Sequence, residues 1–73
     1  MAERPDDLKK LVAVATDLGL SATLRIKAID LIGNIGTHDA LLALLDLAGN
    51  EQLTRGEREL TLKQAMKIVK ATR

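Results

Sequence analysis

The chain has 73 residues, 47% of them apolar, with no Cys, Phe, Tyr or Trp, and its 11 basic and 10 acidic side chains leave a formal net charge of +1. These values exclude disulfides, thiolate metal sites and aromatic stacking on nucleic-acid bases, and they give no general positive field for attracting nucleic acid or an anionic membrane. The apolar content is enough for one small domain with a core of aliphatic side chains.

Neither a secretory signal nor a membrane span is predicted. The N-terminal residues contain no apolar signal core, and no apolar run is long enough to cross a bilayer. We therefore expect a soluble cytoplasmic protein.

A first helix is predicted from residue 5 to about residue 18. Pro5 suits the first position of a helix, and Asp6 and Asp7 then lie near the positive end of its dipole. Gly19 is expected to end the helix. Its apolar face is predicted to consist of Leu8, Leu11, Val12, Ala15 and Leu18.

A second helix is predicted to begin after Ser21, a good N-cap residue. Its predicted buried face consists of Leu24, Ala28, Leu31, Ile32 and Ile35, with Ile29 on the flank. The wetter side is predicted to carry Arg25, Lys27 and Asp30. Gly33 either ends the regular helix or allows a close helix contact, and Gly36 is the favoured left-handed turn residue.

A third helix is predicted to follow Thr37 as its N-cap, with His38 and Asp39 in the first turn. Residues 40–48 are apolar except for Asp46, so this helix must be covered on more than one side. The following Gly-Asn pair is expected to end it.

Residues 51–58 are expected to form a longer, polar connection, within which a fourth helix begins at about residue 55 and runs to residue 71. Thr54 and Glu57 have the spacing of a capping box, although Gly56 leaves a start near Glu57 open. The predicted inner stripe is Leu62, Ala65, Met66 and Val69, flanked by Leu60 and Ile68.

The four predicted helices form two pairs with weak internal repetition. The pattern of residues 7–12 recurs at 40–45, an offset of 33, and that of 28–32 recurs at 65–69, an offset of 37. A period in the thirties is typical of stacked helix pairs. The sequence therefore predicts one all-α domain over residues 1–73, with helical hairpins at 5–36 and 37–73.

Residues 24–45 resemble the HEAT-like repeats of phycobilisome lyase proteins. The matching motifs are Leu24-Arg25-x-x-Ala28, Ile32-Gly33-x-Ile35-Gly36 and Ala40-Leu41-x-x-Leu44-Leu45. The family usually carries Asp-Pro where this chain has Thr37 and His38. With the offset of 37, Leu62 stands at the place of the family arginine and Lys70 at that of the first turn glycine, so the second repeat is atypical, as a terminal capping repeat would be.

The resemblance implies a short α-solenoid of two antiparallel hairpins with a right-handed superhelical tendency. It also implies a structural role for Arg25, which in this family commonly joins adjacent repeats through an acid; Asp39 or an acid of the first helix is the expected partner. Arrays of this kind usually need at least three repeats. A fragment of a longer array, a minimal capped pair and an oligomer all remain open, and Met1 and the charged last residue are compatible with a complete short chain.

No set of residues indicates catalysis, a metal or a cofactor. His38 is the only histidine, and with Asp39 it is interpreted as part of a helix start. The Gly33-x-x-Gly36 motif lacks the preceding strand that a phosphate loop or an RNA-clamping loop requires, so both glycines are interpreted as turn residues. We expect a protein that is not an enzyme.

A short basic stripe is predicted on the outer side of the last helix. Its members are Lys63, Lys67, Lys70 and Arg73. A solvated helix face is the commoner interpretation, and partner binding is the functional alternative. The leading hypothesis is a protein–protein interaction or scaffold module, with a protein partner or self-association. The alternatives are nucleic-acid binding through this stripe and an accessory role beside a lyase-type enzyme.

Overall fold

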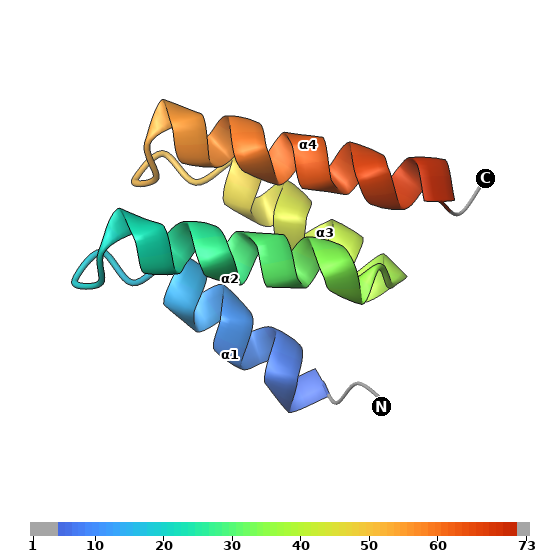
Figure 1. Cartoon of the computed structure of the whole chain (residues 1–73), viewed down its shortest axis with the longest axis horizontal. Helices are drawn as coiled ribbons and strands as arrows, with labels where there is room; N and C mark the ends of the chain where they lie inside the picture. The colour runs from blue at the N-terminus through green and yellow to red at the C-terminus, as the bar shows by residue number, and fades with distance from the viewer. Residues whose placement is uncertain (1–4, 72–73) are drawn as a thin grey trace.

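The computed structural model of the chain describes residues 5–71, whose path is shown in Figure 1. This range contains four α-helices and no β-strand, which confirms the all-α prediction. The helices are α1 (Pro5–Ala15), α2 (Ala22–Ile35), α3 (His38–Ala48) and α4 (Arg55–Ala71).

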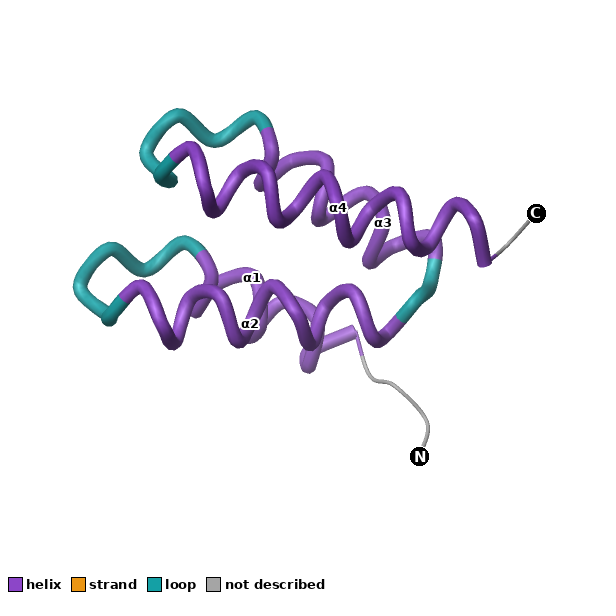
Figure 2. The backbone as a smooth tube through the Cα atoms, turned by 45° about the horizontal axis from the view of Figure 1, so that its top comes forward, coloured by secondary structure: helices purple, strands orange, loops and turns teal. Residues whose placement is uncertain are grey.

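Helix α2 lies at the centre of the molecule. It packs against α1, α3 and α4, and α3 also packs against α4. In Figures 1 and 2, α2 and α4 lie side by side, and the loops at residues 16–21 and 49–54 lie at the same end of the molecule. Helix α2 is therefore buried in several directions, which the pattern of a single helix does not reveal.

Short polar side chains set where helices begin. Ser21 Oγ accepts a hydrogen bond from the Leu24 N–H at 3.3 Å, and Thr37 Oγ1 accepts one from the Ala40 N–H at 3.1 Å. Gly36 ends α2 with a φ of 73°, in the left-handed region that favours glycine. The chain can therefore turn from α2 into α3 within two residues.

Helix α1 is shorter than predicted and ends at Ala15. The Thr16 hydroxyl donates to a carbonyl one turn back at 2.9 Å, and Asp17 Oδ1 accepts a hydrogen bond from the Gly19 N–H at 2.9 Å. These side chains offer the backbone local partners outside the helix. The predicted burial of Leu18 at the end of this helix is wrong, since this residue lies in the loop and is 52% exposed.

The helix starts recur at a single spacing. The starts of α1 and α3, and those of α2 and α4, lie 33 positions apart. The loops agree, because Asp17 and Asn50 each accept a hydrogen bond at 2.9 Å from the N–H two residues further on. The predicted offset of 37 and the predicted longer second loop are therefore wrong. For residues 28–32 a shift of one helical turn matches the apolar letters better than the spacing of 33 does, whereas the turns and caps agree with 33.

The buried side of α2 differs from the predicted one. Arg25, Ile29 and Ile32 are buried, whereas Leu24 and Leu31 are each 48% exposed. Apolar residues occur on both sides of this helix, so periodicity alone does not identify the covered side. The predictions that Leu24 and Leu31 are buried and that Arg25 lies on the wetter side are wrong.

The buried side of α4 is also rotated from the predicted stripe. Thr61, Ala65 and Ile68 are buried. Three residues that were predicted to lie inside are instead exposed, namely Leu62, Met66 and Val69. The second helix pair therefore presents an apolar surface on the side that α2 does not cover.

The core consists of small and branched aliphatic side chains. Its buried members are Ala15, Ala28, Ile29, Ile32, Ala40, Leu44, Leu47, Leu53, Ala65 and Ile68. Helix α2 does not end at Gly33, which is buried and faces Gln64 of α4. Gln64 Nε2 donates to Asp30 Oδ1 at 3.1 Å across this contact. The missing side chain of Gly33 thus gives Gln64 its place between the helices.

Two glycine-to-alanine substitutions are predicted to have opposite effects. A Cβ at Gly56 meets no atom within 4 Å, so Gly56→Ala should raise the free energy of unfolding by roughly 0.5 kcal/mol through lower chain entropy in the unfolded state. A Cβ at Gly33 would contact Gln64 Oε1 and lie 2.7 Å from its Cδ, so Gly33→Ala should lower that free energy by about 1 kcal/mol. Urea unfolding followed by circular dichroism measures both, and equal stabilisation would contradict the close contact.

Candidate functional site

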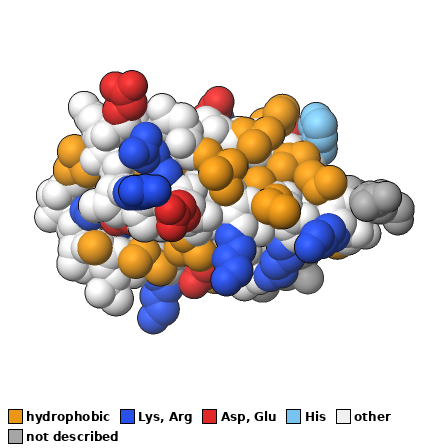
Figure 3. All heavy atoms as spheres, turned by 90° about the horizontal axis from the view of Figure 1, so that it is seen from above, with side chains coloured by type: hydrophobic (Ala, Val, Ile, Leu, Met, Phe, Trp, Pro, Cys, Tyr) orange, Lys and Arg blue, Asp and Glu red, His pale blue; other side chains and the backbone are white. Residues whose placement is uncertain are grey.

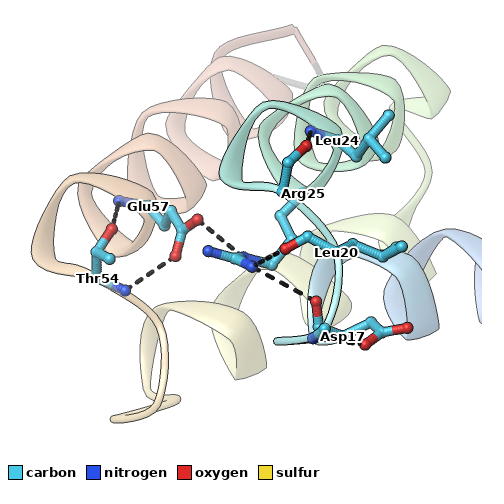
Figure 4. A network of polar contacts seen from close by, with 8 residues as sticks. Asp17, Leu20, Leu24, Arg25, Thr54 and Glu57 are labelled. Atoms are coloured by element: carbon cyan, nitrogen blue, oxygen red, sulfur yellow. Dashed lines mark hydrogen bonds and ion pairs between the residues drawn. The ribbon is translucent and has the colours of Figure 1, made fainter.

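A buried ion pair joins α2 to α4 (Figure 4). Arg25 Nε donates to Glu57 Oε2 at 3.0 Å, and the two residues are only 8% and 2% exposed. Arg25 Nη1 donates to the Leu20 carbonyl at 2.6 Å and makes a longer contact of 3.5 Å with the Asp17 carbonyl. One side chain of α2 therefore holds both the preceding loop and the first turn of α4.

The carboxylate of Glu57 has a second set of contacts in its own helix. Its Oε1 accepts a hydrogen bond from the Thr54 N–H at 2.9 Å, and the Glu57 N–H donates to Thr54 Oγ1 at 3.1 Å, which is the predicted capping box. Burial raises the pKa of the Glu57 carboxyl, but the Thr54 N–H and the Arg25 guanidinium outweigh burial and hold that pKa below its ordinary value of 4.5. The lowered pKa keeps Glu57 ionised, so that it forms an ion pair with Arg25.

The partner expected for Arg25 is wrong. Glu57 bonds it, rather than Asp39 or an acid of the first helix. Sequence reasoning assigned Glu57 to the cap alone, although a carboxylate has two oxygens and only one is used by the Thr54 N–H. The capping glutamate at the start of the neighbouring helix was the feature of the sequence that could have indicated the partner of Arg25.

The predicted turn and capping residues lie at the helix ends or between helices. Gly36 is the left-handed residue after α2, and Thr37 caps α3, with His38 and Asp39 exposed in its first turn. Gly33 instead lies within α2 at its contact with α4. Over residues 5–71 no group of three His, Cys, Asp or Glu is placed to hold a metal ion, and no helix is long and apolar enough to cross a membrane.

An apolar groove lies between α3 and α4 on the exposed side of the second helix pair. Its volume is about 320 Å³, and it is lined by Leu41, Leu45, Leu62, Ala65, Met66, Val69 and Lys70. Figure 3 shows hydrophobic side chains gathered on this part of the surface, with Lys and Arg side chains along the border. Met66 is 58% exposed, so the groove is open to a partner.

The predicted basic stripe borders this groove. Lys63, Lys67 and Lys70 are exposed and, with Gln64 and Met66, line a second hollow along α4. Lys67 Nζ donates to Asn34 Oδ1 of α2 at 3.1 Å, so this lysine also contributes to the contact between the helices.

The fourth member of the predicted stripe, Arg73, lies outside the described residues.

Removal of Arg25 should be far more damaging than removal of an exposed arginine in the same kind of pair. Arg25→Met leaves Glu57 buried without its cation, so we expect the free energy of unfolding to fall by roughly 3 kcal/mol. The control is Arg55→Met, which breaks an exposed pair with Glu59 and should cost at most about 0.5 kcal/mol. Chemical denaturation compares the two variants, and similar losses would contradict a structural role for the buried pair.

The stability contributed by Glu57 should disappear in acid. Its pKa is lower in the folded chain than in the unfolded chain, so its contribution is present above the ordinary value of 4.5 and is lost as the pH falls through the folded-state pKa. Thermal unfolding from about pH 6 to about pH 3 should show a larger loss for the parent chain than for Glu57→Gln. Glu59→Gln, at an exposed site, should follow the parent, and parallel curves for all three would refute the assignment.

No protein-family model, curated protein sequence or solved structure matches this chain. Its function is therefore inferred from its own residues and geometry.

Proposed function

We propose that this chain is a non-enzymatic HEAT-like module that binds another protein. In this proposal α1–α2 and α3–α4 are two antiparallel hairpins stacked as a short α-solenoid. The constant spacing of 33 residues, the contact between α2 and α4, and the arginine–carboxylate link between the pairs support it. Stacked repeats of this kind use the surfaces they leave exposed for binding.

The single observation that carries the proposal is the apolar groove between α3 and α4. Large aliphatic side chains are exposed there together, including Leu45, Leu62 and Met66. A contiguous apolar surface with a polar border is typical of a protein–protein interaction site. A groove between two helices can accept the apolar face of a third helix.

Groove binding predicts that helical ligands depend on Met66. A library of helical peptides is selected on the immobilised chain and counter-selected on Met66→Glu, which places a charge at an exposed position and leaves the core intact. Recovered peptides should lose at least about tenfold in affinity for Met66→Glu and bind normally to Leu18→Glu, an equally exposed leucine in the loop. Peptides that bind all three chains equally would refute the groove as the site.

Nucleic-acid binding is the second candidate, because Lys63, Lys67 and Lys70 line one hollow of α4. A net charge of +1 and the engagement of Lys67 by Asn34 both weaken it. Titration of a labelled DNA duplex at low salt tests this candidate directly. Binding that is removed by changing the three lysines to glutamate would support it, and no binding, or binding that these changes leave unaltered, would refute it.

A further inference from the structure

The period of 33 residues places Arg58 of α4 where Arg25 stands in α2. Arg25 bonds a carboxylate from the neighbouring helix, whereas the Nε of Arg58 is buried and has no hydrogen-bond partner among residues 5–71. A buried guanidinium nitrogen without an acceptor is costly and calls for an explanation. Arg58 thus repeats the donor Arg25, but no residue in the described range acts as an acceptor for its Nε.

Arg58 lies on the same side of α4 as the groove. It precedes Leu62 by four positions and Ala65 by seven, and both of these residues line the groove. In α2 the corresponding side carries Arg25 and Ile29, and α4 covers it. The exposed groove is therefore the equivalent of the α2 surface on which α4 docks.

A second copy of this chain does not supply the missing acceptor. Stacked in the same way, it would present the equivalent of Glu57, which is Leu24, to Arg58. In the chain itself Gln64 of α4 fits against the small residue Gly33 of α2. In the stacked copy the corresponding residues would be Leu31 and Met66, which are both large. The groove is therefore built for a helix that differs from this chain's own outer surface.

The charges around the groove identify the chemistry of that helix. Lys70 lines the groove, and Lys63 and Lys67 lie on the adjoining side of α4. Arg58 and Lys70 are 12 positions apart, about 18 Å along the helix, a distance that a partner helix of about 13 residues spans. Lysines beside an apolar groove, with Arg58 one helical turn before Leu62 on the same side of α4, favour an acidic amphipathic helix.

We propose that the groove docks an acidic amphipathic helix of another protein, whose first-turn carboxylate pairs with the part of the Arg58 side chain that stays exposed, in the place that Glu57 takes beside Arg25. This inference rests on the proposed function and names its partner class. The docked helix runs alongside α4 as α4 runs alongside α2 (Figure 1). Its apolar side chains fill the groove, and acidic residues near its other end face Lys70.

The test uses the full chain and a pair of labelled helical peptides. The acidic peptide carries Glu in its first turn and Leu four, seven and eleven positions later, the spacing of Glu57, Thr61, Gln64 and Ile68 in α4. The neutral peptide has Gln in place of that Glu. Fluorescence anisotropy should show that Arg58→Met weakens the acidic peptide about tenfold and leaves the neutral peptide unchanged. Arg55→Met, which removes an exposed cation of the same helix, should affect neither peptide.

The outcomes separate this inference from the proposed function. If Met66→Glu abolishes binding of both peptides while Arg58→Met weakens both equally or neither, the groove stands and the carboxylate link fails. If the acidic peptide does not bind the parent chain, the proposed partner class is wrong. The peptide selection with Met66→Glu then tests independently whether the groove is a binding site. Concentration-dependent self-association in sedimentation that Met66→Glu abolishes would show that a second copy occupies the groove and would overturn the inference.

Discussion

The ion pair between Arg25 and Glu57 is the interaction on which the arrangement of this chain depends. Charges taken out of water are stabilising only when their hydrogen-bonding groups are satisfied. Here Glu57 divides its oxygens between Arg25 and the Thr54 N–H, and Arg25 adds the Leu20 carbonyl. The same few atoms thereby start α4, hold the loop before α2 and fix the two helices against each other.

Such a link matters in a chain whose core is small. The buried residues are alanines, leucines and isoleucines with no aromatic side chain, and a chain of this length buries a modest share of its surface on folding. Apolar packing alone is tolerant of direction, because aliphatic side chains fill a gap from several angles. A paired guanidinium and carboxylate accept fewer geometries and so specify how α2 and α4 meet.

The side of α2 that carries this link has an exposed counterpart on α4. Helix α4 covers the side of α2 that carries Arg25 and Ile29. The equivalent side of α4 carries Arg58 and Leu62, and Leu62 is 47% exposed and lines the groove. In the proposed repeat the covered side of α2 and the exposed side of α4 are equivalent, and this equivalence is the physical basis of the proposed binding role.

Much of the fold could be predicted from the sequence, because helix starts depend on local chemistry. Ser21, Thr37 and Thr54 all cap helices through bonds to nearby N–H groups. The buried sides could not be predicted in the same way. Leucines occur on both sides of α2, and Leu31 is exposed and Ile29 buried because of how α2 packs against its neighbouring helices.

The candidate site was missed for a related reason. Glu57 had a sufficient local explanation as a cap, so its bond to Arg25, 32 positions away, was not anticipated. With an offset of 37 the counterpart of Arg25 is Leu62, so the correspondence between Arg25 and Arg58 was not recognised. The turns formed by Asp17 and Asn50 carry the period of 33 that brings the two arginines into correspondence.

The most direct measurement is a double-mutant cycle on the ion pair, with Arg25→Met, Glu57→Gln and the combined variant unfolded in urea. If Arg25 and Glu57 hold α2 and α4 together through each other, the sum of the two single losses of unfolding free energy should exceed the loss in the combined variant by at least about 1.5 kcal/mol. Additive losses would show that the two residues stabilise the chain independently and would contradict the central role of their contact.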